Sequence, residues 1–216
     1  MKPTVKTCLP FILLILVTVF AQAQTDDFEI IKKRVIAEIM KGNIDDARLK
    51  SIIEKMNEDG SFQGINYDDL SRTAGFPHRR HTENLVYMAK AYKTKSSGFY
   101  KNKKLKAQIE RGLQYWVEYD FFGDNWHDNQ ISTPTNLGNL MLIIGNDLPK
   151  DLVEKAQPMI GRAHMNASGA RPSGDRIVIA GILAKNLLFL GNREEFDKVI
   201  RIIEGEIKFS TGERGM

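Results

Sequence analysis

The side chains best suited to chemistry gather in loop segments, and the clearest of these spans residues 123–134. Trp126 and His127 stand there beside Asn129, between two apolar helical patterns. An indole ring can stack on the apolar face of a sugar, and amides can donate to hydroxyls or carboxylates. This segment predicts a sugar-binding surface. The alternative is that Trp126 fills space between helices while Asn129 and Gln130 hold the loop backbone.

A second segment, residues 166–176, is rich in glycine and carries Arg171 and Arg176 directly before an apolar helical pattern. The planar guanidinium group suits a carboxylate or sulfate, and the N-terminus of a helix favours an anion. We expect both arginines to bind an anionic substrate. The alternative is that Ser173 or Asp175 caps the helix and that an arginine pairs with a nearby acid.

A third segment, residues 65–74, either lines the same cleft or clips one part of the fold to the next. His78 and His81 have the spacing of metal ligands, but no cysteine and no clear third ligand accompany them. The chain also has no GxSxG motif, phosphate-binding loop or dinucleotide fingerprint. We therefore expect neither a metal ion nor a cofactor.

The elements that must position these segments are helices, because apolar residues recur at intervals of three and four almost throughout. No segment shows the alternation of a strand, so we predict an all-α fold of stacked antiparallel helical hairpins. Periodicity alone does not choose between a solenoid and a toroid. We predict helices over residues 28–42, 45–56, 78–92, 102–122, 134–144, 150–163, 176–190 and 193–207, and we expect Pro158 to bend or split the helix that contains it.

The first residues predict export. Lys2 and Lys6 precede an apolar run from Leu9 to Phe20, and small residues follow at Ala21 and Ala23. This pattern is typical of a secretory signal peptide over residues 1–23, because a spanning helix needs roughly 20 apolar residues. We expect residues 24–216 to form one domain, secreted or periplasmic, with no membrane anchor after cleavage.

The charge is modest. The net charge of the whole chain is +4, and the predicted leader carries two lysines and no acid, which leaves +2. Such a balance argues against a general nucleic-acid binder. Arg79, Arg80 and the lysines between 101 and 106 are dense enough to meet an anionic polymer, although a solvated helix face would look the same.

Three motifs, in their order along the chain, resemble a known family of polysaccharide lyases. Residues 66–72 look like its early YxDxSR loop, residues 125–131 like its NWWxNEI segment, and residues 173–180 like its TGANRxDIA segment. The family includes chondroitin AC lyase, hyaluronate lyase and xanthan lyase. The resemblance implies an α/α toroid, here incomplete, whose cleft binds an acidic polysaccharide. We expect this polysaccharide to be the partner and the protein to be a monomer.

Family members cut uronic-acid polymers by β-elimination, in which an amide neutralises the uronate carboxylate and a His/Tyr pair transfers protons. The resemblance places the catalytic amide on Asp175 and the paired tryptophans on Trp126 and His127. An ionised aspartate cannot donate to a carboxylate. Asp175 is therefore protonated, or Arg171 or Arg176 replaces it, or the segment aligns differently.

The catalytic His and Tyr of the family would lie beyond Met216. We therefore expect this chain alone, as the first part of a lyase, to be inactive. Two alternatives remain open. One is a glycan-binding module without activity. The other is a glycoside hydrolase on an α/α toroid, for which Asp124, Asp128 and Asp175 could supply paired carboxylates.

Overall fold

The computed structural model describes residues 27–207, so the predicted signal peptide lies outside the described residues. Within this range the chain is helical, and its one strand-like feature is an isolated bridge between Met56 and Phe62. A helix covers residues 27–39 and is followed by α2 (Asp46–Glu54), α3 (Arg79–Lys93), α4 (Lys103–Tyr119), α5 (Thr133–Ile144), α6 (Lys150–Ile160), α7 (Gly174–Leu190) and α8 (Arg193–Glu206). Short helical turns lie at η1 (Arg72–Ala74), η2 (Asp128–Ser132) and η3 (Gly145–Asp147).

Polar side chains begin several of these helices. Asp45 accepts the backbone N–H groups of Ala47 and Arg48 before α2, and Asn102 and Asn192 cap α4 and α8 in the same way. Each cap satisfies N–H groups that have no partner inside the helix, which stabilises the helix by about 1 kcal/mol.

Several helices end two or three residues before the prediction; the helix predicted over residues 28–42, for example, ends at residue 39. The helix predicted to reach residue 122 ends at Tyr119, because Asp120 adopts a left-handed conformation with φ of 45°. The helix predicted over residues 150–163 ends at Ile160. Pro158 lies inside its last turn and has no N–H group to bond to the carbonyl oxygen four residues back, which is consistent with the early end of the helix.

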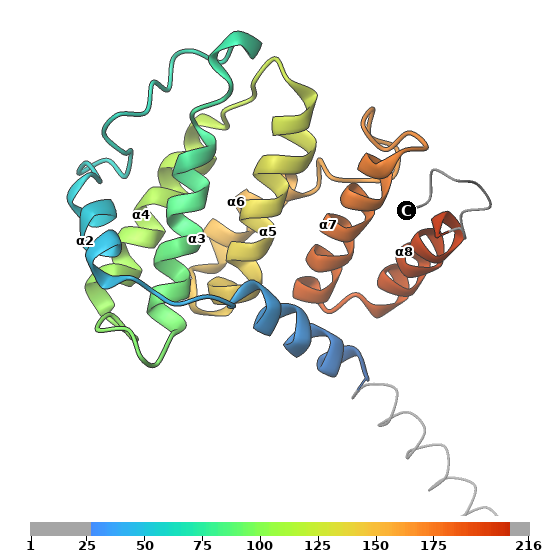
Figure 1. Cartoon of the computed structure of the whole chain (residues 1–216), viewed down its shortest axis with the longest axis horizontal. Coiled ribbons are helices and arrows are strands. Elements are labelled where there is room, and N and C mark those ends of the chain that lie inside the picture. The colour runs from blue at the N-terminus through green and yellow to red at the C-terminus, as the bar shows by residue number, and fades with distance from the viewer. Residues whose placement is uncertain (1–26, 208–216) are drawn as a thin grey trace, which may run out of the picture.

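The helices form antiparallel hairpins, α3 with α4, α5 with α6 and α7 with α8 (Figure 1). The hairpins stack because α3 packs on α5 and α5 packs on α7, while α4 packs on α6. Between the helices lies an apolar core whose centre includes Leu85, Leu113, Trp116 and Leu137, all fully buried. The predicted fold of stacked helical hairpins is confirmed. No helix within the described range is long and apolar enough to cross a bilayer.

The topology brings the three chemistry-bearing segments to one end of the molecule. Because α3, α5 and α7 run in the same direction, the segments that precede them all lie at the upper end in Figure 1. These are residues 57–78, 120–132 and 161–173. A binding surface built from several loops is therefore possible at this end.

Candidate functional site

Asn129 holds the loop between α4 and α5 in place. Its side chain is buried, with 3% exposed, and its amide pairs with the backbone of Gly123 on both sides. Asn129 Nδ2 donates to the Gly123 carbonyl oxygen at 2.7 Å, and Asn129 Oδ1 accepts from the Gly123 N–H at 3.0 Å. This is the loop-holding arrangement that the sequence left open beside substrate binding.

Gln130 joins two segments that are distant in sequence. Its Nε2 donates to Ser168 Oγ at 2.9 Å, and its Oε1 accepts the N–H of Gly169 at 2.9 Å. Trp126 is half-buried against the same segment, where a Cβ added at Gly169 would overlap the indole ring. The glycine therefore makes room for the tryptophan, a role that the sequence alone did not reveal.

Arg171 and His127 lie beside this tryptophan and are exposed. The guanidinium carbon of Arg171 is 5.9 Å from the centroid of the Trp126 ring, and the His127 ring centroid is 5.7 Å from it. Arg171 belongs to no ion pair among residues 27–207. We call Trp126, His127 and Arg171 the Trp126 surface. It combines a ring that can stack on a sugar with a cation that can bind an anion.

Arg176 is not part of the Trp126 surface, because its donors bond to other groups of the protein. Its Nε donates to Glu206 Oε1 at 2.8 Å, and its Nη1 donates to the Ala170 carbonyl oxygen at 2.8 Å. The arginine thus ties the start of α7 to the end of α8. Asp175 lies half-exposed in the first turn of α7. As a carboxylate it can accept hydrogen bonds but cannot donate one to another carboxylate.

Asp128 is buried and forms an ion pair with Arg79, whose side chain is 41% exposed. The Asp128 side chain is 2% exposed, and the Arg79 Nη2 atom lies 2.6 Å from the Asp128 Oδ1 atom. Ser132 Oγ donates to the same oxygen at 3.2 Å. These contacts fix η2 against the start of α3, and they leave this carboxylate poorly placed for acid–base work on a bound sugar.

Tyr67, in the third segment, belongs to an interior hydrogen-bond network. Its hydroxyl lies 2.8 Å from His81 Nδ1 and accepts the Phe62 N–H at 3.0 Å. His81 Nε2 lies 2.9 Å from the Gly112 carbonyl oxygen. A carbonyl only accepts, so Nε2 carries the proton and Nδ1 accepts from Tyr67. We call Tyr67, His81, Phe62 and Gly112 the Tyr67 network.

Burial sets the protonation of this network. Desolvation lowers the pKa of His81 from 6.5 to about 4 and raises the pKa of Tyr67. His78 is also buried, and its Nε2 lies 2.9 Å from the Tyr67 carbonyl oxygen. Neither histidine joins a group of three metal-ligating side chains within the described residues. The two histidines lie in the aromatic interior.

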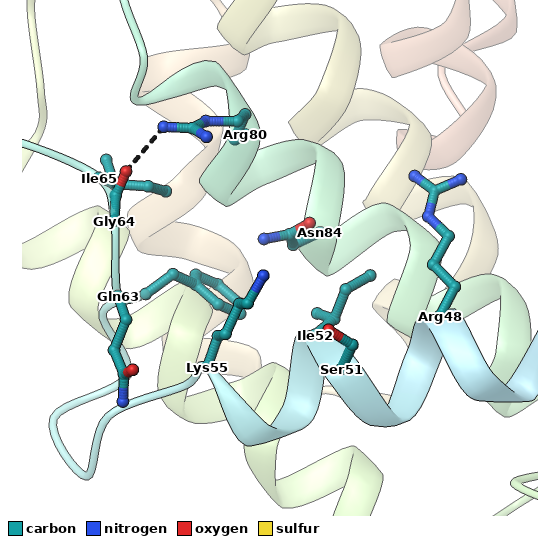
Figure 2. A pocket seen from close by; sticks show the side chains of 10 residues that line it. Arg48, Ser51, Ile52, Lys55, Gln63, Gly64, Ile65, Arg80 and Asn84 are labelled. Atoms are coloured by element: carbon teal, nitrogen blue, oxygen red, sulfur yellow. Dashed lines mark hydrogen bonds between the residues drawn. The ribbon is translucent and has the colours of Figure 1, made fainter.

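A cavity lies between α2, residues 62–65 and α3, and it shares no lining residue with the Trp126 surface (Figure 2). Its volume is about 570 Å³, and its lining includes Arg48, Lys55, Arg80 and Asn84. Arg80 is therefore separated in function from its neighbour Arg79, which pairs with Asp128. The sequence signal for this cavity was the spacing of polar residues along one face of α2, which we did not single out.

Comparison with known proteins found a matching family and several similar proteins. The family described as "Polysaccharide lyase family 8, N terminal alpha-helical domain" matches residues 17–173. Chondroitinase-AC of Pedobacter heparinus is 30% identical over 146 residues, which cover 67% of this chain and 21% of that protein.

Solved structures agree with this match. A chondroitinase AC lyase, studied as enzyme–oligosaccharide complexes, aligns with 87% of this chain and 28% of its own at 25% identity, with a TM-score of 0.75. Xanthan lyase of Paenibacillus and chondroitin AC lyase of Streptomyces coelicolor A3, the latter in complex with chondroitin sulphate, share the fold at 18% identity. Their TM-scores are 0.64 and 0.66; each match covers 86% of this chain, and 19% and 28% of theirs. The chain thus spans less than a third of the length of these proteins.

Proposed function

The chain belongs to polysaccharide lyase family 8, and on this premise we propose that it forms the N-terminal helical part of an α/α-toroid lyase. The proposed enzyme cleaves uronic-acid-containing polysaccharides, such as chondroitin or hyaluronan, by β-elimination. We propose further that residues 1–23 direct export, so that the mature protein acts outside the cytoplasm as a monomer. N-terminal sequencing of the exported product should find a start near Gln24, and recovery of Met1 in a membrane fraction would contradict it.

The observation that supports the substrate class is the Trp126 surface. Its indole ring provides a platform for a pyranose, and Arg171 places an exposed guanidinium group 5.9 Å from the ring centroid. A sugar that stacks on this ring brings its own carboxylate or sulfate within reach of such a cation. The fork of the guanidinium group matches the two oxygens of a carboxylate.

Arg171 is the better candidate for the role that the family gives to an amide. Asp175 cannot donate to a carboxylate, and the donors of Arg176 are directed to Glu206 and Ala170. A cation that neutralises the uronate carboxylate makes the neighbouring C5 proton easier to remove, because negative charge develops there in the transition state. We assign stacking to Trp126 and His127 and loop positioning to Asn129.

Proton transfer needs a base and an acid within hydrogen-bond reach of the substrate. Tyr67 and His81 have the right chemistry for it, but each is bonded to the other in the interior. We therefore propose that the proton-transfer groups lie outside residues 24–216, and we expect no turnover by this chain alone. The test is the ultraviolet absorbance of the unsaturated uronate after incubation with chondroitin or hyaluronan. Turnover lost on His127→Ala would contradict the proposal.

The whole reading frame tests the activity itself. The gene should be expressed with the DNA that follows codon 216, and its product should release unsaturated uronates from chondroitin or hyaluronan. Saturated products would indicate a hydrolase, and binding without products would indicate a glycan-binding module. The ion pair of the buried Asp128 with Arg79 argues against the hydrolase alternative, since it engages one of the three candidate carboxylates.

A further inference from the structure

The cavity between α2 and α3 carries chemistry that the Trp126 surface does not use. We propose that it is a second saccharide site, which binds a sugar unit bearing a sulfate or carboxylate. The inference rests on the proposed function in one respect only: the proposed function names the polymer from which this sugar unit comes. The cavity itself is defined by residues that no motif of the resemblance includes.

Two helix faces and one loop build the cavity. Arg48, Ile52 and Lys55 follow one another at spacings of four and three, so they share one face of α2 and its C-terminal end. Arg80 and Asn84 are four residues apart on α3 and face them. In Figure 2, Lys55 and Asn84 point toward one another between the two arginines.

The charge of the lining is of one sign. Arg48, Lys55 and Arg80 line the cavity, and no acidic side chain of residues 27–207 does. None of the three belongs to an ion pair among residues 27–207. A concave surface with cations and no acid attracts and holds anions.

Two of these cations are held in position before any ligand binds. Arg48 lies over the ring of Tyr87, with its guanidinium carbon 4.3 Å from the ring centroid. Arg80 Nη2 donates to the Gly64 carbonyl oxygen at 2.7 Å, which leaves its remaining N–H groups for a ligand. A guanidinium group that is already oriented loses less freedom on binding.

The loop wall is equally fixed. The Gln63 N–H donates to the Lys55 carbonyl oxygen at 2.9 Å, so the loop returns to the end of α2. Phe62 is buried, and its N–H donates to Tyr67 at 3.0 Å. The Tyr67 network therefore supports the cavity from behind.

Size and lining favour a sugar unit over a bare ion. The volume of about 570 Å³ is within the range of sites for small organic ligands. Ile65 supplies apolar surface above the buried side chains of Ile52 and Phe62, and Ser51 and Asn84 supply hydroxyl and amide groups. Such a lining suits a ring with one apolar face, several hydroxyls and an anionic substituent.

The test uses the full chain with isotope labelling and three titrants: a sulfated chondroitin tetrasaccharide, a hyaluronan tetrasaccharide and inorganic sulfate. The amide signals of Asn84 report on the cavity, and the indole signal of Trp126 reports on the Trp126 surface. We expect an anionic tetrasaccharide to shift the Asn84 signals. Arg48→Gln with Lys55→Gln should weaken this effect about tenfold or more. Lys50→Gln, on the opposite face of α2, is the charge control and should leave it unchanged.

The outcomes separate this proposal from the proposed function. Shifts at Trp126 without shifts at Asn84 would overturn the cavity proposal and leave the proposed function standing. Shifts at Asn84 alone would support the cavity and count against the Trp126 surface. Sulfate that binds the cavity as tightly as the sugars would show a plain anion site, which also overturns the proposal. Equal weakening by Lys50→Gln would reduce the effect to net charge and overturn it too. Circular dichroism should show that each variant is folded.

Discussion

The Tyr67 network and the Trp126 surface contain similar residues and lie at the same end of the molecule. They differ in whether their polar groups already have partners within the protein. In the network, Tyr67 and His81 satisfy one another and two backbone groups, all in the interior. On the surface, Trp126 is half-buried and Arg171 lies beside it without an acidic partner in the described range. An aromatic ring with a polar neighbour therefore indicates function only where the polar group is left available.

Tyr67→Phe should have the largest effect, because it leaves the Phe62 N–H and His81 Nδ1 without partners in the interior. Each unsatisfied buried group costs about 1–3 kcal/mol, so we expect the free energy of unfolding to fall by about 2–4 kcal/mol. Urea unfolding measures this. Tyr100→Phe is the matched control, since its side chain is exposed and should change stability by less than about 0.5 kcal/mol. Equal effects at both positions would show that the network is not satisfied as described.

The network should also make stability depend on pH. The pKa of His81 is about 4 in the folded chain and about 6.5 when unfolded, so the unfolded state binds the proton first as pH falls. Stability is therefore fully present above pH 6.5 and is lost as pH falls toward about 4, by up to about 3 kcal/mol. Urea unfolding across this range should show the slope. His81→Gln should remove it, and His127→Gln, at an exposed site, should not.

Trp126→Ala tests the Trp126 surface. We expect oligosaccharide binding to weaken by about 1–3 kcal/mol, on the scale of stacking on aromatic side chains, with stability nearly intact. Isothermal titration and thermal unfolding measure the two quantities. A loss of stability of about 3–5 kcal/mol, the cost of truncating a core aromatic, would make Trp126 a core residue instead.

Gly169→Ala should have the smallest effect and act through geometry alone. The added Cβ would displace the Trp126 ring, and we expect binding to weaken by about 1 kcal/mol through this strain. Gly174→Ala is the control, because a Cβ at Gly174 meets no atom within 4 Å. Unchanged binding in Gly169→Ala would show that the position of the ring is not critical.

The sequence predicted the helices well because apolar periodicity reports directly on a buried face. The end of α4 was missed, since the left-handed conformation of Asp120 has no signal in periodicity. The sequence also identified the three loop segments, but it left open whether residues 65–74 lie beside the other two; the direction of the helices places all three at one end. Their roles were harder to predict. Arg176 and its partner Glu206 are 30 residues apart, and only packing brings them together.

The cavity was not predicted from the sequence for the same reason: only packing brings its lining residues together. Its cations come from α2 and α3. The sequence marked Arg80 as part of a basic cluster, but it did not connect this residue with Arg48 and Lys55. Arg79 and Arg80 are adjacent, yet one faces a buried aspartate and the other faces the cavity. Only the rotation of α3 about its axis separates them, and that rotation is set by core residues such as Leu85.

The π-helical turn η2 sets the direction in which the Trp126 surface faces. Its ladder bond runs from the Thr133 N–H to the Asp128 carbonyl oxygen, five residues back rather than four, so the turn contains one residue more than an α-helix would. One residue corresponds to about 100° of rotation about a helix axis. Loss of a single codon here would leave α5 intact while turning the preceding loop to a different side. Insertions and deletions at this turn thus offer evolution a way to redirect binding without rebuilding the scaffold.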